Sequence, residues 1–214
     1  MSNKPLNINE KYSITDKISL ENYYDPPLEI AKSIMLNSLD KYHILYIKKS
    51  PFICIATTDA DGQPTISPKG DKPGFTEIID NNTLIIPDRI GNNKLESLHN
   101  LVENPKIGLI FMVPGAKETL RISGTAQITT DKKLLKFGQI GGKTVKAGLI
   151  VHITKCYFHC GKAIIRSKLW NEESKISKGT LPSFGKIINE QAKLQESVKS
   201  SDDLVTHVYK NELY

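Results

Sequence analysis

The chain has 214 residues, of which 39% are hydrophobic and 24% are charged, and its formal net charge is +6. These proportions are ordinary for a globular protein, and the length suits one large domain, or one domain with a tail. A positive net charge fits either an anionic ligand or a nucleic acid. The lysines are spread along the chain without a run of five like charges, which favours local anion sites. We therefore predict a small-molecule ligand and no nucleic-acid partner.

Nothing in the sequence suggests a membrane or a secreted location. No stretch approaches the roughly 20 apolar residues that a membrane span requires. The first residues, MSNKPLNINEKYS, lack the apolar core of a signal peptide. The three cysteines are an odd number, which argues against a disulfide framework. We predict a cytoplasmic protein with no membrane association.

Short β-prone runs alternate with turn residues through the middle of the chain. Strands are expected at 52–58, 64–69, 75–79, 83–86, 107–113, 119–129 and 147–158. The turn residues at 59–62 and 80–82 predict that the first two and the next two strands form hairpins. Six or seven short strands with one mid-chain helix predict a mainly β fold, an antiparallel barrel with flanking helices.

Helical spacing of apolar residues appears on both sides of the first strand pair. Helices are expected at 28–39, at about 38–48, and after Asn92 or Asn93, either of which can cap the helix. Short helices are expected at about 132–137 and 161–170. Residues 1–25 are polar and show no sustained period. We divide the chain into an N-terminal arm and helix (1–38), a barrel (39–170) and a C-terminal extension (171–214).

Four cations stand at turns or strand ends in the central region: Lys69, Arg89, Lys94 and Arg121. Lys69 ends a strand beside a glycine. Arg89 lies in the loop before the mid-chain helix, whose start carries Lys94 together with Asn92 and Asn93. A phosphate needs donors and positive charge from several directions, and a helix N-terminus supplies free N–H groups. The residues leave two interpretations open, which are ordinary solvated ion pairs and one convergent phosphate site.

The order of motifs in this region resembles one family. The segments SPKGD, PGF, PDRxGNNKLESLxNLxxNPxIGLxF and ETLRIxGxA, followed by HCGKAIIRSKLW, resemble the pyridoxamine 5′-phosphate oxidase family of FMN-binding split barrels. More narrowly, they are similar to its uncharacterised subgroup of FMN-dependent enzymes. The resemblance covers about residues 39–170. It implies a six-stranded antiparallel split β-barrel, a homodimer with FMN between the subunits, and hydride transfer between FMN and a small-molecule substrate.

Cofactor-binding residues follow from this resemblance and from the phosphate argument: Ser67, Lys69, Arg89, Asn92, Asn93, Lys94, Arg121 and Trp170. By position, Ser67 and Lys69 fall where the family's strand touches the ribityl chain and the phosphate. Trp170, the one tryptophan of the sequence, is either a wall over the flavin ring or a core anchor. No residue is assigned as a catalytic acid or base. The basic substrate-binding motif that ends the family's pyridoxamine-phosphate oxidases is replaced here by NELY, so the resemblance does not extend to their substrate.

Two other functions stay open on this barrel. The first is a binding or carrier protein for flavin or haem that performs no catalysis, and the second is a deazaflavin-dependent reductase. Asp71 follows Lys69 closely and is expected either to cap a turn or pair with a nearby cation, or to contact the edge of the flavin ring.

Histidines and cysteines are assigned structural roles. Cys156, His159 and Cys160, with His152, cluster in sequence, but their spacing matches no standard zinc pattern. We predict no metal site, and buried free thiols instead. His43 and His99 lie on the predicted amphipathic helices and are expected to be structural, so they are not candidate ligands.

Overall fold

The computed structural model describes residues 9–214, which fall into two compact units divided between Met35 and Leu36. The first unit contains η1 (Glu10–Tyr12), α1 (Lys17–Tyr23) and α2 (Glu29–Ser33). None of these three elements has a buried residue. The expected helix over 28–39 is therefore wrong in length, because α2 ends at Ser33 and Leu36 instead forms a β-bridge with Cys156.

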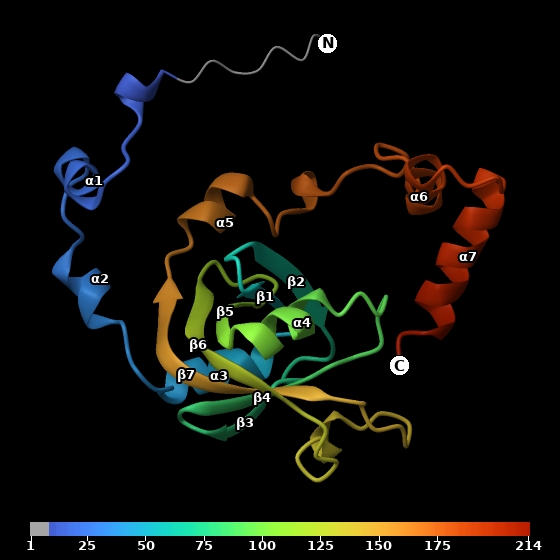
Figure 1. The fold of residues 1–214 in the computed structure, drawn as a ribbon, viewed down its shortest axis with the longest axis horizontal. Coiled ribbons are helices and arrows are strands. Elements are labelled where there is room, and N and C mark those ends of the chain that lie inside the picture. The colour runs from blue at the N-terminus through green and yellow to red at the C-terminus, as the bar shows by residue number, and fades with distance from the viewer. Residues whose placement is uncertain (1–8) are drawn as a thin grey trace. The chain divides into compact units, whose positions relative to one another are not determined.

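The second unit is built on one sheet. Its elements are α3 (Lys41–Lys49), β1 (Phe52–Thr58), β2 (Pro64–Gly70), β3 (Glu77–Asp80), β4 (Thr83–Pro87), α4 (Glu96–Glu103), β5 (Lys106–Met112), β6 (Thr119–Thr129), η2 (Lys136–Gly138), β7 (Gly148–His159), α5 (Lys162–Ser167), η3 (Glu172–Ser174), α6 (Phe184–Ala192) and α7 (Val198–Asn211). Neighbouring strands are antiparallel, in the order β2-β1-β5-β6-β7-β4-β3 (Figure 1). The predicted mainly β fold with flanking helices is confirmed.

The sheet differs from the expected barrel in two respects. It has seven strands where the family resemblance implied six, and its two edge strands, β2 and β3, do not pair with each other. The shortest strand, β3, pairs with β4 alone within residues 9–214. Both predicted hairpins, β1–β2 and β3–β4, are present.

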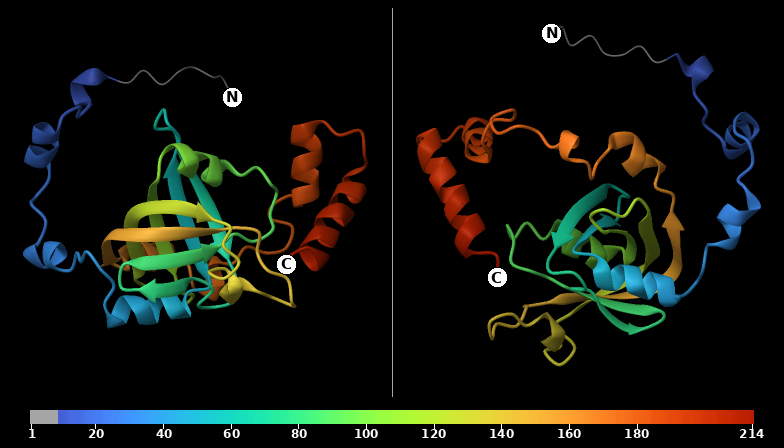
Figure 2. Two further views of the ribbon diagram at one scale, coloured as in Figure 1. Left: turned by 60° about the horizontal axis from the view of Figure 1, so that its bottom comes forward. Right: turned by 180° about the vertical axis from the view of Figure 1, so that it is seen from behind.

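The core lies inside the curved sheet. Strands β1, β5 and β6 alternate buried and more exposed residues, which is the period of a strand with one face inward. Fully buried side chains of this core include Ile53, Ile55, Leu84, Phe111, Leu120, Ile122 and Val151. Each such side chain contributes about 1.5–3 kcal/mol to stability. Helices α3 and α4 cover opposite ends of the barrel (Figure 2).

Helix α4 is held on the β1–β2 hairpin by buried polar contacts. The Asn100 side-chain amide donates to the hydroxyls of Thr57 and Thr65, at 3.0 and 3.1 Å. Asn104 donates to the Thr58 hydroxyl at 2.7 Å. Buried polar groups are costly unless they are hydrogen-bonded, so these bonds fix where α4 sits. The loop that enters α4 is thereby held beside β2.

Strand β6 changes register next to its one glycine. The pairing with β7 shifts between Ser123 and Gly124, as at a β-bulge. A Cβ on Gly124 would lie 2.0 Å from the carbonyl oxygen of His152. The close approach of the two strands therefore requires glycine here. Separately, no helix within residues 9–214 is long and apolar enough to cross a membrane.

Candidate functional site

A cavity of about 250 Å³ lies between β2 and the segment that enters α4. Residues 65–69 of β2 form one side, and residues 88, 89 and 91–98 form the other. Six of the eight residues predicted at the cofactor line this cavity: Ser67, Lys69, Arg89, Asn92, Asn93 and Lys94. The structure thus brings together residues that are up to 27 positions apart in the chain (94 − 67).

Strand β2 presents its polar residues by simple alternation. Thr65, Ser67 and Lys69 are half-buried, whereas Ile66 and Pro68 between them are exposed. Ser67 and Lys69 pair with Ile55 and Ile53 of β1, so the hairpin register fixes their positions along the strand. The strand period therefore places one hydroxyl and one ammonium on the side that faces α4.

The loop before α4 has an unusual backbone. Asn93 and Leu95 adopt left-handed φ values of 55° and 57°, a conformation that costs a residue such as leucine roughly 1–2 kcal/mol. The Asn92 side chain accepts a hydrogen bond from the Lys94 N–H at 3.1 Å. Such outliers persist where surrounding structure enforces them and often mark a binding site.

The predicted helix cap is wrong. Leu95, and not Asn92 or Asn93, is the N-cap of α4, and it makes no side-chain capping bond. The Asn92 side chain instead accepts a hydrogen bond from the Lys94 N–H in the loop before the helix, so it does not cap α4. The first N–H groups of α4 consequently have no side-chain acceptor at the cap position. They stand at the cavity, where Ser97 is 8% exposed, and an anion could accept from them.

Two of the three cations of the cavity are paired with carboxylates. The Lys69 ammonium lies 3.0 Å from Asp88, and Arg89 Nε lies 2.6 Å from Asp71. Arg89 also donates to the carbonyl of Gly138. Lys94 has no carboxylate partner among residues 9–214. Lys69 and Arg89 are therefore held in place by their ion pairs, and among the described residues Lys94 is the cation of this cavity without a carboxylate partner.

Asp71 is an acceptor that positions Arg89. Burial by itself would raise its pKa, but hydrogen bonds from the Lys72 N–H, the Tyr214 hydroxyl and Arg89 outweigh burial and hold the pKa below the ordinary value. The carboxylate is 2% exposed and stays ionised. Of the roles expected for Asp71, the structure shows the ion pair with a neighbouring cation.

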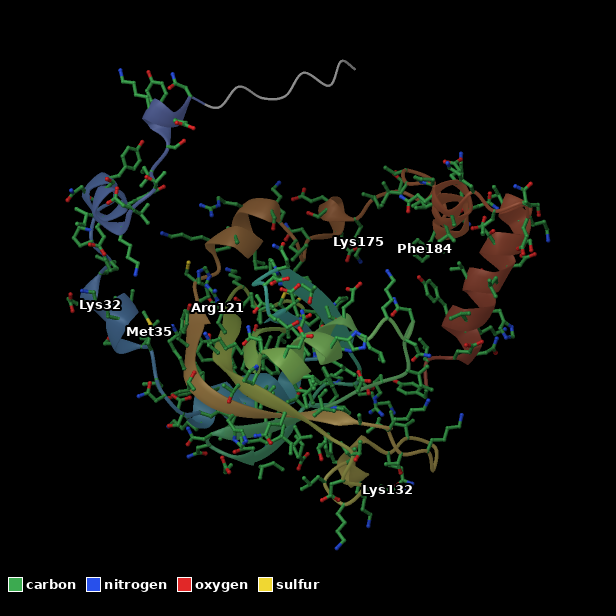
Figure 3. The ribbon with its side chains drawn as sticks, viewed as in Figure 1. Lys32, Met35, Arg121, Lys132, Lys175 and Phe184 are labelled. Carbon is green, nitrogen blue, oxygen red and sulfur yellow. The ribbon has the colours of Figure 1, made fainter. Side chains whose placement is uncertain are left out.

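Arg121 and Trp170 do not line this cavity. Arg121 lies on the exposed side of β6, 5.6 Å from the ring of Tyr157 on β7. Strands β1 and β5 separate β6 from β2 in the sheet, and Figure 3 shows Arg121 at the β7 side of the barrel. Trp170 Nε1 donates to the carbonyl of Ala116 at 2.7 Å. The expectation that four cations of one chain converge is therefore wrong for Arg121, because strand order sets it apart.

The cysteine and histidine predictions have mixed outcomes. Cys156 is buried and free, and burial, helped by nearby Asp40, raises its pKa to about 11. Cys160 is exposed, so the expectation of a buried thiol is wrong there. His43 is buried and accepts from the Asp40 N–H at 3.2 Å in a capping box, which confirms a structural role. Within residues 9–214 no group of three or more metal-ligating side chains is present.

Sequence reasoning missed Asp88, whose carboxylate lies in the cavity beside Lys69. It also missed Ser97 in the first turn of α4. The signal for Asp88 was its place directly before Arg89 in the PDR segment. Asp88 pairs with Lys69, which lies 19 residues earlier in the chain. The sequence alone does not show that two residues so far apart in the chain are in contact.

The comparisons with known proteins concern the barrel. The family model described as Pyridoxamine 5'-phosphate oxidase matches residues 40–159, which is more than half of the chain. No curated protein sequence matches.

Three solved structures are similar over the same part. HupZ of Group A Streptococcus has 26% identity over 56% of this chain and 93% of its own, with a TM-score of 0.45. General stress protein 26 of Bacillus anthracis has 12% identity over 61% of this chain and 94% of its own, with a TM-score of 0.42. An FMN-binding protein of Syntrophomonas wolfei has 15% identity over 54% of this chain and 86% of its own, with a TM-score of 0.40.

Proposed function

This chain belongs to the pyridoxamine 5'-phosphate oxidase family, and from that premise we propose that it binds FMN and works as an FMN-dependent oxidoreductase. The observation that carries the proposal is the cavity that gathers Lys69, Arg89 and Lys94 around an uncapped helix start. Bound flavin would supply the hydride chemistry, and the chain would bind and orient it. The substrate is a small molecule whose identity this cavity does not define.

The residues of the cavity fit a phosphate group. Three cations and two carboxylates, Asp88 and Glu96, are among its lining residues, a net charge of +1 (3 − 2). A phosphate would add contacts to Lys94, to the asparagine-rich loop and to the first N–H groups of α4. The volume of about 250 Å³ is below the roughly 300–1,000 Å³ of sites for drug-sized ligands. The cavity would therefore hold the phosphate and part of the ribityl chain, with the flavin ring outside it.

A purified-protein titration tests the cofactor directly. FMN and riboflavin are added to flavin-free protein, and binding is followed by the change in flavin fluorescence. Riboflavin lacks the phosphate, so each charge-assisted hydrogen bond that the phosphate makes should favour FMN by roughly 1.5–3 kcal/mol. We expect FMN to bind at least about tenfold more tightly. Equal affinities would refute the phosphate cavity, and failure of both flavins to bind would refute the cofactor assignment.

We further propose that the flavin site is completed by a second copy of the chain. Arg121 and Trp170 do not line the cavity, and we assign their contact with the flavin to a partner subunit. Ile66 of β2 is 73% exposed, and its row in the sheet continues through Ala56 and Gly108. Ala56 carries only a methyl group and Gly108 has no side chain, so this face is flat. A flat, apolar face suits association.

Two measurements test that arrangement. Light scattering should give a dimer, and Arg121→Ala should weaken FMN binding by roughly 1.5–3 kcal/mol. Flavin bound near Trp170 should also quench the fluorescence of that one tryptophan. A monomer, or FMN affinity unchanged in the Arg121→Ala protein, would count against a shared site. The cytoplasmic location predicted from the sequence remains a prediction.

The alternative functions are separable by experiment. None of the described residues lining the cavity is a histidine, so it offers haem no imidazole ligand. Anaerobic addition of NADH or NADPH distinguishes an oxidoreductase from a flavin carrier, because only the former should reduce its flavin productively. Competition binding between FMN and a deazaflavin cofactor tests the deazaflavin-dependent reductase alternative, which requires that the deazaflavin binds more tightly.

A further inference from the structure

A second cavity of about 230 Å³ lies on the other side of Arg89. Arg89, Asp88 and Asn93 line both cavities. The rest of its wall comes from residue 90, from the segment between β6 and β7, and from residue 214, three positions beyond the end of α7 (214 − 211). It includes three aliphatic side chains, two lysines and one aromatic ring: Ile90, Ile140, Val145, Lys143, Lys146 and Tyr214. The site predicted from the sequence used none of these six.

Tyr214 is fixed in this wall by three contacts. Its hydroxyl donates to Asp71 at 3.0 Å, and its ring lies 5.6 Å from the guanidinium carbon of Arg89. Its main-chain oxygen accepts from Lys143 at 3.5 Å. The bond to the Asp71 carboxylate raises the pKa of Tyr214, so the phenol remains a donor at neutral pH. Figure 1 shows the chain beyond α7 reaching the loop before α4.

The charges of this cavity leave an attraction for anions. Asp88 is paired with Lys69, and Arg89 with Asp71. Within the part of the chain that the structure describes, neither Lys143 nor Lys146 has an aspartate or glutamate partner, and Lys143 donates to the main-chain oxygen of Tyr214. An aliphatic wall, an aromatic ring and two ammonium groups form an amphipathic site, because the apolar part favours a hydrocarbon body and the lysines favour a carboxylate.

We propose that this second cavity binds a small organic anion that carries one ring, an aromatic or alicyclic carboxylate, with Tyr214 as the aromatic wall. Its volume of about 230 Å³ is below the roughly 300–1,000 Å³ of sites for drug-sized molecules, which limits the ligand to about one ring. The site is distinct from the phosphate cavity, and Arg89 is the residue through which the two would influence each other. The inference does not require that FMN binds.

The test uses benzoate as the probe and benzamide as its uncharged analogue, titrated calorimetrically into the full chain. We expect benzamide to bind at least tenfold more weakly. The double variant Lys143→Gln with Lys146→Gln should lose the preference for benzoate over benzamide. The control is the double variant Lys133→Gln with Lys136→Gln, at exposed lysines of the same segment, and it should keep that preference. Lys94→Gln should weaken FMN and leave benzoate binding unchanged. Benzoate that binds no better than benzamide, or a preference that survives loss of Lys143 and Lys146, overturns the proposal.

A second pair of variants tests the aromatic wall. Tyr214→Ala should weaken benzoate several-fold and Tyr214→Phe should not, because the ring is kept. Tyr209→Ala is the matched control, since Tyr209 is 60% exposed on α7 and lies outside both cavities. No saturable binding at roughly 10 mM benzoate, which would nearly fill a site of 1 mM affinity, overturns the proposal. If benzoate does not bind but FMN does, the second-cavity proposal fails and the proposed function stands. If FMN does not bind but benzoate does, the proposed function fails and the second-cavity proposal stands.

Discussion

The Lys69–Asp88 ion pair gives a sharp test of the phosphate cavity. Lys69 Nζ and Asp88 Oδ1 are 3.0 Å apart, and the side chains are 26% and 22% exposed. Lys69→Gln would remove one charge-assisted contact to the phosphate, worth roughly 1.5–3 kcal/mol. It would also leave Asp88 facing the phosphate without its cation. At an effective dielectric constant of about 20 and a separation of about 6 Å, that repulsion is about 3 kcal/mol. Together the two contributions come to about 4.5–6 kcal/mol, so FMN affinity should fall by more than roughly a thousandfold.

The double variant separates the two contributions. Adding Asp88→Asn to Lys69→Gln removes the repulsion, so it should restore about 2–3 kcal/mol of FMN binding. Riboflavin affinity should be nearly constant across the series, because riboflavin has no phosphate. Lys72→Gln, an exposed lysine outside the cavity, serves as the matched control, and thermal unfolding checks that each variant is folded. Equal losses for FMN and riboflavin, or a double variant no better than Lys69→Gln, would refute the reasoning.

Three further predictions concern stability, each measured by urea unfolding. Burial lowers the pKa of His43, against the opposing charge of Asp40. The unfolded chain therefore binds a proton first, and stability should fall by up to about 1.4 kcal/mol per pH unit as the pH drops below about 6.5. His43→Gln keeps the capping acceptor and should flatten the dependence of the unfolding free energy on pH. An unchanged pH dependence would show that His43 is not its cause. Asn100→Ala removes the two hydrogen bonds to the hydroxyls of Thr57 and Thr65, which keep only the bond to each other, and should cost about 1–3 kcal/mol. A neutral result would contradict the role of Asn100 in holding α4 on the hairpin. Gly124→Ala places a Cβ 2.0 Å from the opposing carbonyl oxygen and should cost at least about 1–3 kcal/mol, whereas Gly91→Ala, which meets nothing within 4 Å, should cost less.

Much of the barrel was predictable because its strands obey local rules. Strand β6 was expected at 119–129 and is observed at Thr119–Thr129, since its alternation is unbroken. The helix expected over 28–39 failed for a non-local reason, because Leu36 exchanges backbone hydrogen bonds with Cys156, 120 residues away (156 − 36). Helices α6 and α7 were not expected, although Ser183 and Ser197 cap them and could have signalled their starts.

The candidate site was predictable in its members and not in its pairings. Local patterns placed Ser67 and Lys69 on one strand face and Lys94 in the first turn of the helix, one residue before the N-cap that the structure shows. They could not show that Asp71 and Arg89, 18 residues apart, form an ion pair, because the loops that carry them meet only in the folded chain. The cap failed for a different reason. A leucine in the left-handed conformation is rare, so sequence rules assign the cap to asparagine.

The position of Arg121 has a physical consequence for the whole site. Adjacent strands of a sheet lie about 4.8 Å apart, so β6, three places from β2 in the sheet order, is about 14 Å away along the sheet. Arg121 also lies in the cross-strand row of Ile110, Cys54 and Pro68, whereas Lys69 lies in the adjacent row of Ile53, Phe111 and Leu120. The two side chains therefore leave opposite faces of the sheet and do not meet at one phosphate of the same chain. Either Arg121 takes no part in binding, or it belongs to the flavin held by another copy. In the second case the two ends of each flavin are gripped by different chains, and flavin binding and subunit association must stabilise each other.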